Sequence, residues 1–439
     1  MLLSFRAQNV RSFKDEIELS LLSTAMAEPE VVHHVPWRRG GKAVGVLPAA
    51  AIFGANGSGK SNVLRAMHDM RSYVLFSFRY ADRDGGFQRR AFRLGGEGQV
   101  PSRFEMDLVI GGIRHEYGFV VDDEGVREEW AVHYPNGKAA LLFERTGDEV
   151  KLGSSIRSHG RAIVDFLPPN ALFLSAAAAA RRPVLSHLSG WFSRNLQLAE
   201  ADSRNRRQAL TTQMLEEPRT RFAVLELLRV ADLGISGANR VDMDPVMRER
   251  FTRALRILDG LEAEPEPGSD DGPEVDLFKV KLVHDGADGP VEFEEDDESL
   301  GTLVWFGLVG PILQSLSRGS VLLVDELDAS LHPELVGALV SLYQDSSVNR
   351  QRAQLVFNSH DATLLGDAAG RRPLGRDQVW FTEKSNGGGS RLYPLADLDP
   401  RKEEAVARRY LAGRYGAKPI ISRSELAGAI DLVLDGSNS

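Results

Sequence analysis

The sequence lacks cysteine altogether, so none of its 439 residues carries a thiol. Disulfides, iron–sulfur clusters, thiolate zinc sites and cysteine nucleophiles are therefore excluded. Positive charge is not in excess either, since 53 Lys and Arg residues stand against 62 Asp and Glu residues and give a formal net charge of −9. We therefore do not expect a generally basic nucleic-acid binder, although a local basic face is compatible with this balance.

Long hydrophobic runs are also scarce. The N-terminus reaches Arg6 at once, which argues against a signal peptide. Residues 300–316 form an uncharged stretch, but it contains Gly307, Gly310 and Pro311 and is short for crossing a bilayer. We interpret this stretch as a buried helix rather than a membrane span. Together with the missing cysteines, which fit a reducing compartment, these features predict a cytoplasmic protein without a membrane partner.

A sustained heptad pattern is absent, and three regions differ in their patterning instead. Residues 1–175 favour strands, with alternating or apolar runs at 17–22, 46–53, 104–110, 114–121 and 130–134. Residues 176–265 carry apolar side chains at helical spacing, and in residues 266–439 strands alternate with helices as in a parallel sheet. We predict an α/β fold class with a mixed and parallel sheet, an antiparallel β lobe and a helical insertion.

The clearest motif is a glycine-rich loop that follows an apolar run ending at Phe53. Residues 54–61 read GANGSGKS, a complete G-x-x-x-x-G-K-S, and the residues after them can continue as a helix. Glycines let backbone N–H groups converge on phosphate oxygens, and the helix points its positive end at the same anion. We expect Lys60 to contact the β- and γ-phosphates and the Ser61 hydroxyl to ligate Mg²⁺. A glycine-rich turn with a surface lysine is the alternative.

Two further apolar runs end in groups suited to phosphate chemistry. Residues 320–324 lead to Asp325 and Glu326, as at the carboxyl end of a buried parallel strand. We expect Asp325 to hold Mg²⁺ through water, and Glu326 to orient or deprotonate the attacking water. Residues 354–357 lead to His360, which could hydrogen-bond the γ-phosphate. The alternatives are a strand that ends in solvated acids and an ordinary surface histidine.

Several stretches together resemble the ABC/SMC-type P-loop ATPase heads, in particular the RecF-like and abortive-infection (AAA family, OLD- and AbiL-like) prokaryotic ATPases. The similar stretches are residues 9–14, the P-loop followed by Asn62, a signature-like motif at 298–302, a Walker B and D-loop unit at 325–333, a switch-histidine motif at 358–361, and a closing segment at 409–417. Residues 176–265 lie outside this resemblance.

The resemblance implies an ATP-hydrolysing head whose two copies enclose two ATP molecules, with Mg²⁺ as cofactor. Ser299 and Gly301 of one copy would meet the γ-phosphate on the P-loop of the other, while a plain helix cap is the alternative for Ser299. Glu298 departs from the transporter form of the motif, which has leucine there. The residues implied to bind ATP are Gly54, Asn56, Gly57, Ser58, Gly59, Lys60, Ser61, Asn62, Ser299 and Gly301. Those implied to act in catalysis are Lys60, Glu326 and His360, and those implied to hold the metal are Ser61 and Asp325.

The implied function is an ATP-dependent homodimer that controls a separate protein effector, in phage defence by abortive infection. The alternative is RecF-like, ATP-gated DNA binding in repair or recombination. The basic clusters for that alternative are residues 38–39, 89–90, 204–207 and 371–372, which are otherwise solvated surface. Gln88 is a candidate glutamine-loop residue or simply a residue of a solvated basic loop. Arg11 and Phe13 could shape the nucleotide pocket, although Phe13 could equally pack in the core.

Overall fold

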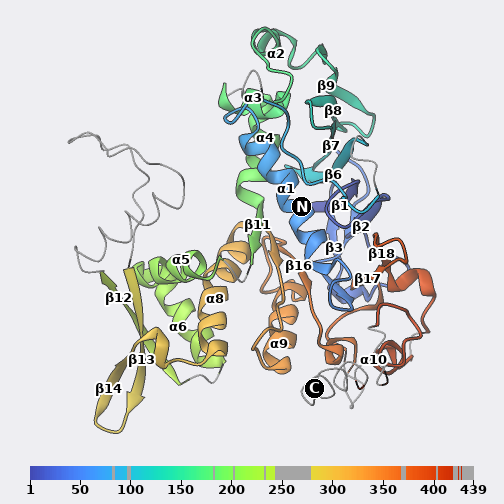
Figure 1. Cartoon of the computed structure of the whole chain (residues 1–439). Coiled ribbons are helices and arrows are strands. Elements are labelled where there is room, and N and C mark those ends of the chain that lie inside the picture. Colours follow the sequence, from blue (N-terminus) through green and yellow to red (C-terminus); the bar gives the residue numbers. More distant parts are fainter. Residues whose placement is uncertain are drawn as a thin grey trace, which may run out of the picture. The chain divides into compact units, whose positions relative to one another are not determined.

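The computed structural model describes residues 1–81, 85–95, 100–180, 183–200, 203–231, 234–242, 278–366, 372–401 and 404–418, with Ser424 and Ala427 (Figure 1). Their contacts divide the chain into two compact units. The first unit consists of Met1–Leu198, Ser315–Asp328 and His332–Ser439, and the second unit of Ala199–Gln314 and Ala329–Leu331. The boundaries of these units differ from the divisions at 175 and 265 proposed from the sequence.

A six-stranded sheet carries the glycine-rich loop in the first unit. Its strands in spatial order are β11 (Leu196–Ala199), β15 (Val321–Val324), β16 (Gln354–Asn358), β5 (Ala49–Gly54), β17 (Val379–Lys384) and β18 (Ser390–Pro394). Strands β15, β16, β5 and β17 are parallel, whereas β18 is antiparallel to β17. Every residue of β15, β16 and β5 is buried, which explains why these strands are near-continuous apolar runs in the sequence.

A seven-stranded antiparallel sheet forms the β lobe of the same unit. Its strands in spatial order are β10 (Glu149–Leu152), β9 (Ala140–Thr146), β8 (Val126–His133), β7 (Ile113–Val121), β6 (Ser102–Ile110), β1 (Leu2–Gln8) and β2 (Ile17–Ser20). Strand β6 shows the expected alternation, because Phe104, Met106 and Leu108 are buried and the residues between them are not.

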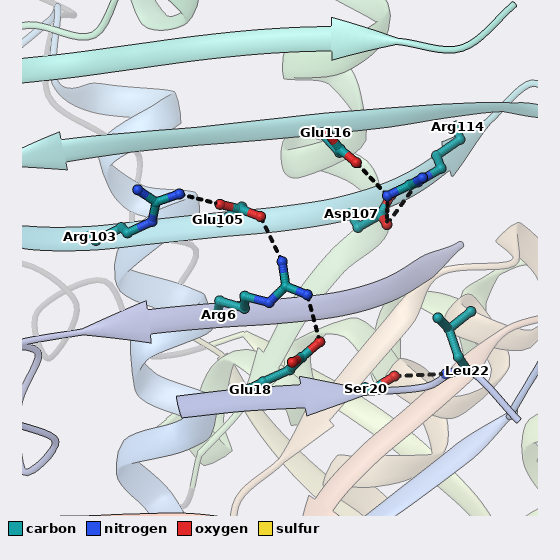
Figure 2. A network of polar contacts seen from close by, with 9 residues as sticks. All are labelled: Arg6, Glu18, Ser20, Leu22, Arg103, Glu105, Asp107, Arg114 and Glu116. Carbon is teal, nitrogen blue, oxygen red and sulfur yellow. Dashed lines mark hydrogen bonds and ion pairs between the residues drawn. The ribbon is translucent and has the colours of Figure 1, made fainter. Parts of the chain in front are cut away.

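The outward face of this lobe is covered by ion pairs that cross from strand to strand (Figure 2). Arg6 on β1 contacts Glu18 on β2 and Glu105 on β6, each at 2.9 Å. Further along, Arg114 on β7 bonds Asp107 on β6 at 2.9 Å. These arginines therefore have carboxylate partners on neighbouring strands, and the face is a mixture of both signs of charge rather than a basic surface.

Helices join the two sheets into one hydrophobic core. Helices α1 (Lys60–Phe76), α3 (Phe173–Ala179) and α4 (Pro183–Asn195) contribute to the core together with residues of β1, β5, β6 and β16. The remaining elements of the first unit are β3 (His33–Val35), β4 (Val44–Val46), α2 (Arg157–Val164), α9 (Pro333–Gln344) and α10 (Val406–Leu411), with short 3₁₀ helices at Pro29–Val31, Ala362–Leu365, Arg376–Gln378 and Leu395–Leu398.

The second unit combines helices with a three-stranded antiparallel sheet. Its elements are α5 (Arg204–Glu216), α6 (Pro218–Val230), β12 (Ile235–Asp242), β13 (Phe278–Gly286), β14 (Gly289–Phe293), a 3₁₀ helix at Glu295–Asp297 and the first part of α8 (Leu300–Arg318). Helix α8 contains Pro311, which cannot donate to the helical ladder. Just before it, Thr211 Oγ1 donates to the carbonyl of Phe306 at 2.7 Å and accepts the amide of Gly310 at 3.0 Å, so a side chain from α5 enters the ladder.

Helix α8 confirms the prediction of a buried helix at residues 300–316. It is long and apolar enough to cross a membrane by length and composition, but 61% of its most apolar stretch is buried inside the chain. Trp305 and Phe306 are almost fully buried, and the Trp305 indole donates to the carbonyl of Leu227 on α6 at 3.0 Å. The helix is thus part of the core of a folded unit.

Most predicted elements are present, with shifted ends. The run 46–53 divides at Pro48 into the end of β4 and β5, and the strand predicted at 130–134 is the end of the longer β8. The described part of region 176–265 contains helices α4, α5 and α6, in line with the helical pattern, but also β11, which extends the central sheet, and β12. In the closing part of the chain, helix α10 is limited to Val406–Leu411. Residues 243–265 of the predicted helical region lie outside the described residues.

Candidate nucleotide site

The glycine-rich loop connects β5 to α1 with the backbone geometry that a phosphate cradle requires. Gly57 and Gly59 have φ angles of +74° and +110°, values that favour glycine. Gly59 is also the N-cap of α1, and a Cβ there would lie 2.7 Å from Ser390 Oγ. The loop is anchored below by the Ser58 hydroxyl, which lies 2.7 Å from the Thr382 hydroxyl on β17. Sequence and packing therefore both demand glycine where the chain turns into the helix.

Two asparagines of the motif have different surroundings. Asn56 is exposed at the tip of the loop. Asn62 is half-buried on the first turn of α1, and its side-chain amide donates to Ser12 Oγ at 2.9 Å. The stretch 9–14 that entered the sequence resemblance is thereby tied to the start of the P-loop helix.

Lys60 lies at the centre of the loop. Its ammonium donates to the carbonyls of Gly54 and Ala55 at 2.9 and 3.1 Å, and lies 3.4 Å from His360 Nδ1. Burial lowers the pKa of Lys60 to about 8, against the opposing effect of Glu326 and two other nearby acids. At pH 7 the side chain is therefore still mostly charged. The two backbone carbonyls hold the Lys60 ammonium in place, where an anionic ligand can attract it.

Asp325 and Glu326 follow the buried strand β15. The Asp325 side chain is 10% exposed, and its Oδ2 lies 3.4 Å from the Arg65 guanidinium on α1. Glu326 is exposed and has a φ angle of +57°, a conformation that costs a non-glycine residue about 1–2 kcal/mol. Such strain persists only where the surroundings hold the turn in place.

Asn358, the last residue of β16, holds that turn. Its side-chain oxygen accepts the backbone N–H of Glu326, and its own carbonyl accepts the N–H of Leu327 at 3.2 Å. Its Nδ2 donates to Asp325 Oδ1 at 2.5 Å and to Ser61 Oγ at 3.3 Å. The hydroxyl of the P-loop and the carboxylate at the end of β15 therefore converge on one point.

His360 is also fixed by its backbone. The N–H of His360 donates to Asp328 Oδ2 at 3.0 Å, while its imidazole is exposed beside Lys60. The structure thus brings Lys60, Ser61, Asp325, Glu326 and His360 together at the carboxyl ends of β5, β15 and β16, as parallel strands allow. Within the described residues, no group of three or more His, Asp or Glu side chains is arranged to hold a metal ion.

A basic pocket of about 430 Å³ adjoins the start of α1. Its lining includes Ser12, Asn62 and the cationic residues Arg11, Arg90, Arg93 and Lys384. Arg11 makes a two-point contact with Asp69 on α1, at 2.6 and 2.7 Å. Phe13 is fully buried in the core, as its alternative interpretation expected, and Gln88 is exposed and is not among the residues that line this pocket.

The signature-like motif belongs to the second unit. Ser299 Oγ accepts the backbone N–H of Thr302 at 3.1 Å, so it caps the first turn of α8. A Cβ at Gly301 would lie 2.6 Å from the carbonyl of Ser330, which explains the glycine by close packing. Glu298 does not face the helix start, because its carboxylate bonds His284 Nε2 on β13 at 2.6 Å and its side chain is only 6% exposed.

The closing segment 409–417 packs against the P-loop sheet. The rings of Tyr410 and Tyr415 stack on Phe381 of β17 at 5.5 and 5.8 Å, and Tyr410 also contacts Phe53 at the end of β5. The Tyr393 hydroxyl on β18 donates to the carbonyl of Tyr415 at 2.7 Å. This part of the resemblance therefore has a packing role beside the strand that enters the loop.

Sequence reasoning missed three residues of the site. Asn358, Asp328 and Thr382 hold the turn after β15, the backbone of His360 and the P-loop, respectively. Asn358 and Asp328 were part of quoted motifs, yet their tasks depend on partners about 30 residues away along the chain. The polar end of an otherwise apolar strand was the only signal for Asn358.

Comparison with known proteins gives a family match over most of the chain. Residues 49–366 match the model of the family described as "AAA domain, putative AbiEii toxin, Type IV TA system". No curated protein matches the sequence.

Solved SMC heads are similar in structure. The SMC head domain from Thermotoga maritima has 12% identity and a TM-score of 0.37, over 90% of this chain and 98% of that one. An Smc head bound to the C-winged helix domain of ScpA has 11% identity and a TM-score of 0.39, over 91% and 99%. An Smc head with an extended coiled coil from Pyrococcus furiosus, bound to the C-terminal domain of ScpA, has 11% identity and a TM-score of 0.37, over 91% and 97%.

Proposed function

The chain belongs to this family of AAA-domain P-loop ATPases, and we propose that it hydrolyses ATP with Mg²⁺, dimerises around the nucleotide and controls a separate effector. One observation carries the proposal. A cationic lysine, a hydroxyl, an acidic pair and an exposed imidazole gather around a glycine loop at the start of a helix. Phosphoryl transfer needs this combination of a cradle, a metal site and a group that positions water.

The oxygen ligands present at the site fit a magnesium ion. Ser61 Oγ and Asp325 Oδ1 both contact the amide nitrogen of Asn358, so two oxygen ligands of the type Mg²⁺ prefers converge on one place. In this proposal Ser61 and Asp325 hold the ion, directly or through water. When bound, Mg²⁺ would neutralise the charge of the phosphates.

Glu326 is the proposed base. The residue is exposed at the acidic end of β15, on a turn with left-handed backbone geometry. A carboxylate in this place can orient water and accept its proton. Lys60 would stabilise charge on the β- and γ-phosphates, and His360 would hydrogen-bond the γ-phosphate.

Dimerisation would complete the site. Ser299 is exposed at the start of α8, where a hydroxyl and helix N–H groups are suited to an anion. Since Glu298 is engaged by His284, its charge does not occupy that surface. We therefore place Ser299 and Gly301 of one copy against the γ-phosphate held by the other.

The effector and its biological role are drawn from the family. Its description names a toxin of a type IV toxin–antitoxin system. A head whose assembly depends on ATP is suited to restrain or release a partner protein, and this supports a role in phage defence by abortive infection.

The alternative is ATP-gated DNA binding in repair or recombination. Two of the arginines that could serve it have other tasks, because Arg89 bonds Asp123 and Ser102 with its side chain 1% exposed, and Arg207 is buried. Among the described residues, Arg38, Arg39, Arg90, Arg204, Arg206 and Arg372 remain as candidates, and Arg371 lies outside them. ATP-dependent DNA binding that weakens steeply with salt would favour this alternative.

The substitution Glu326→Gln tests the proposed function. We expect ATP turnover to fall by about a hundredfold or more, because the base is lost while the cradle stays intact. ATP should then accumulate in a dimer, which light scattering would detect. Glu149→Gln, a change at an exposed glutamate on β10, is the matched control and should leave turnover unchanged. Normal turnover by the Glu326→Gln chain would remove Glu326 from catalysis.

A further inference from the structure

Asn358 contacts more residues of the proposed nucleotide site than its place in the motif at 358–361 indicates. The residue is fully buried at the end of β16. Its NH₂ group donates to Asp325 and Ser61, and its oxygen accepts the amide of Glu326. One side-chain amide therefore touches both proposed metal ligands and the turn that carries the proposed base.

The NH₂ group and a metal ion need the same oxygens. An amide nitrogen can only donate, so it must use a lone pair of Asp325 Oδ1 and one of Ser61 Oγ. Each oxygen keeps a second lone pair, but Mg²⁺ binds oxygen at about 2.0–2.1 Å, so an ion that contacts both oxygens has to lie where they converge. Asn358 Nδ2 already lies against both oxygens in that place, at 2.5 and 3.3 Å. The second Asp325 oxygen is close to Arg65, at 3.4 Å, so both oxygens of the carboxylate already have a donor.

The strained turn adds a second connection. Glu326 adopts its positive φ while the Asn358 oxygen holds its N–H. Because the NH₂ and the oxygen belong to one planar group, a rotation that removes the first from the metal ligands also moves the second away from Glu326.

We propose that Asn358 is a positioning residue that locks the metal-free site, and that Mg²⁺ displaces it from Ser61 and Asp325 when it binds with ATP. The displacement would couple metal binding to release of the Glu326 turn. This inference rests on the proposed binding of ATP and Mg²⁺ and adds a residue that sets how much Mg²⁺ the site requires.

Binding of a fluorescent ATP analogue across a range of Mg²⁺ concentrations tests the proposal on the full chain. In Asn358→Ala the competing donor is gone, so we expect the Mg²⁺ concentration for half-maximal binding to fall about tenfold, the effect of one hydrogen bond to a charged group. We also expect the melting temperature without Mg²⁺ and nucleotide to be lower than that of the unchanged chain.

An equal or higher Mg²⁺ requirement in Asn358→Ala would overturn the proposal. If that variant does not fold, Asn358→Leu decides the matter, since it keeps the approximate shape and removes the donor without adding a charge that would itself attract Mg²⁺. In Asn358→Leu a tenfold or larger decrease supports the displacement, and an unchanged requirement contradicts it.

Asn349→Ala is the matched control. Asn349 is equally buried in the loop before β16, and its side chain bonds the backbone of Tyr343 on α9 and of Ala353. This change should lower the melting temperature without altering the Mg²⁺ requirement. A shifted requirement in this control would overturn the proposal, because it would show a general effect of replacing a buried asparagine. Failure of the unchanged chain to bind the analogue with Mg²⁺ would refute the proposed function itself, and the inference with it.

Discussion

The P-loop site of the first unit and the signature-like motif of the second unit differ in what their key residues contact. In the first unit the functional groups hold one another: Lys60 lies beside His360, and Asn358 joins Ser61 to Asp325. In the second unit, the Ser299 side chain bonds only Thr302 of the same helix start among the contacts of the described residues. The first site is therefore organised within one chain, whereas the second offers an exposed serine whose hydroxyl bonds only within its own helix start.

This difference separates two properties of the protein. Apart from the proposed displacement of Asn358, groups that are already positioned bind a ligand with little reorganisation, so nucleotide affinity should belong to the single chain. An exposed serine that caps its own helix gains a further role only when another molecule approaches it. ATP binding and ATP-dependent dimerisation should accordingly respond to different substitutions.

Lys60→Ala should have the largest effect and would test the first half of the comparison. Removing a charged donor from a buried phosphate site should weaken ATP binding by about a hundredfold or more. Calorimetric titration of the single chain with Mg²⁺ and a slowly hydrolysed ATP analogue would measure it. Lys138→Ala, a change at an exposed lysine between β8 and β9, should bind like the unchanged chain. Unchanged affinity for ATP after Lys60→Ala would refute the assignment of the glycine-rich loop as a phosphate cradle.

Ser299→Arg tests the second half of the comparison, which concerns the signature-like motif. A bulky cation at the start of α8 should weaken the ATP-dependent dimer by about a hundredfold, because an interface centre tolerates an unmatched charge poorly. Affinity of the single chain for ATP should stay within about twofold. Analytical ultracentrifugation with the Glu326→Gln background would report the dimer.

Ser236→Arg provides the control, since Ser236 is exposed on β12 of the same unit. Full-strength dimers in the Ser299→Arg chain would mean that Ser299 only caps its helix. The comparison would then describe two independent structural features rather than two halves of one nucleotide site.

The contrast also explains what the sequence could predict. The P-loop was predictable because eight consecutive residues supply its backbone turns, its lysine and its hydroxyl. Strands β15, β16 and β5 were predictable because burial on both faces makes them apolar runs. The task of Asn358 was not, because it arises only when three strand ends from distant parts of the chain meet.

Short elements escaped prediction for a related reason. Strand β11 has four residues and lies directly after helix α4, so local pattern gives it no separate signal. Its strand geometry comes from pairing in the central sheet, whose other members are far away in sequence. Similarly, the motif shows Glu298 only as a departure from the transporter form, and the fold supplies His284 as the partner of its carboxylate.

His284→Ala should have the smallest effect and would sharpen the comparison at Glu298. The loss of this partner frees a carboxylate one residue before Ser299, where it can approach the phosphate of the other copy. A repulsion of about 1 kcal/mol at a solvated surface corresponds to roughly a fivefold weaker ATP-dependent dimer. Measurement by ultracentrifugation should show single-chain ATP affinity unchanged.

The double variant His284→Ala, Glu298→Gln separates charge from packing. If the freed carboxylate is the cause, neutralising it should restore the dimer to near its original strength. His284 also packs against Phe293, with ring centroids 4.8 Å apart, so a purely structural role predicts the same loss in both variants. Restoration would mean that the second unit prepares its exposed surface for an anion by turning its own negative charge inward, just as the first unit prepares its site by holding its ligands together.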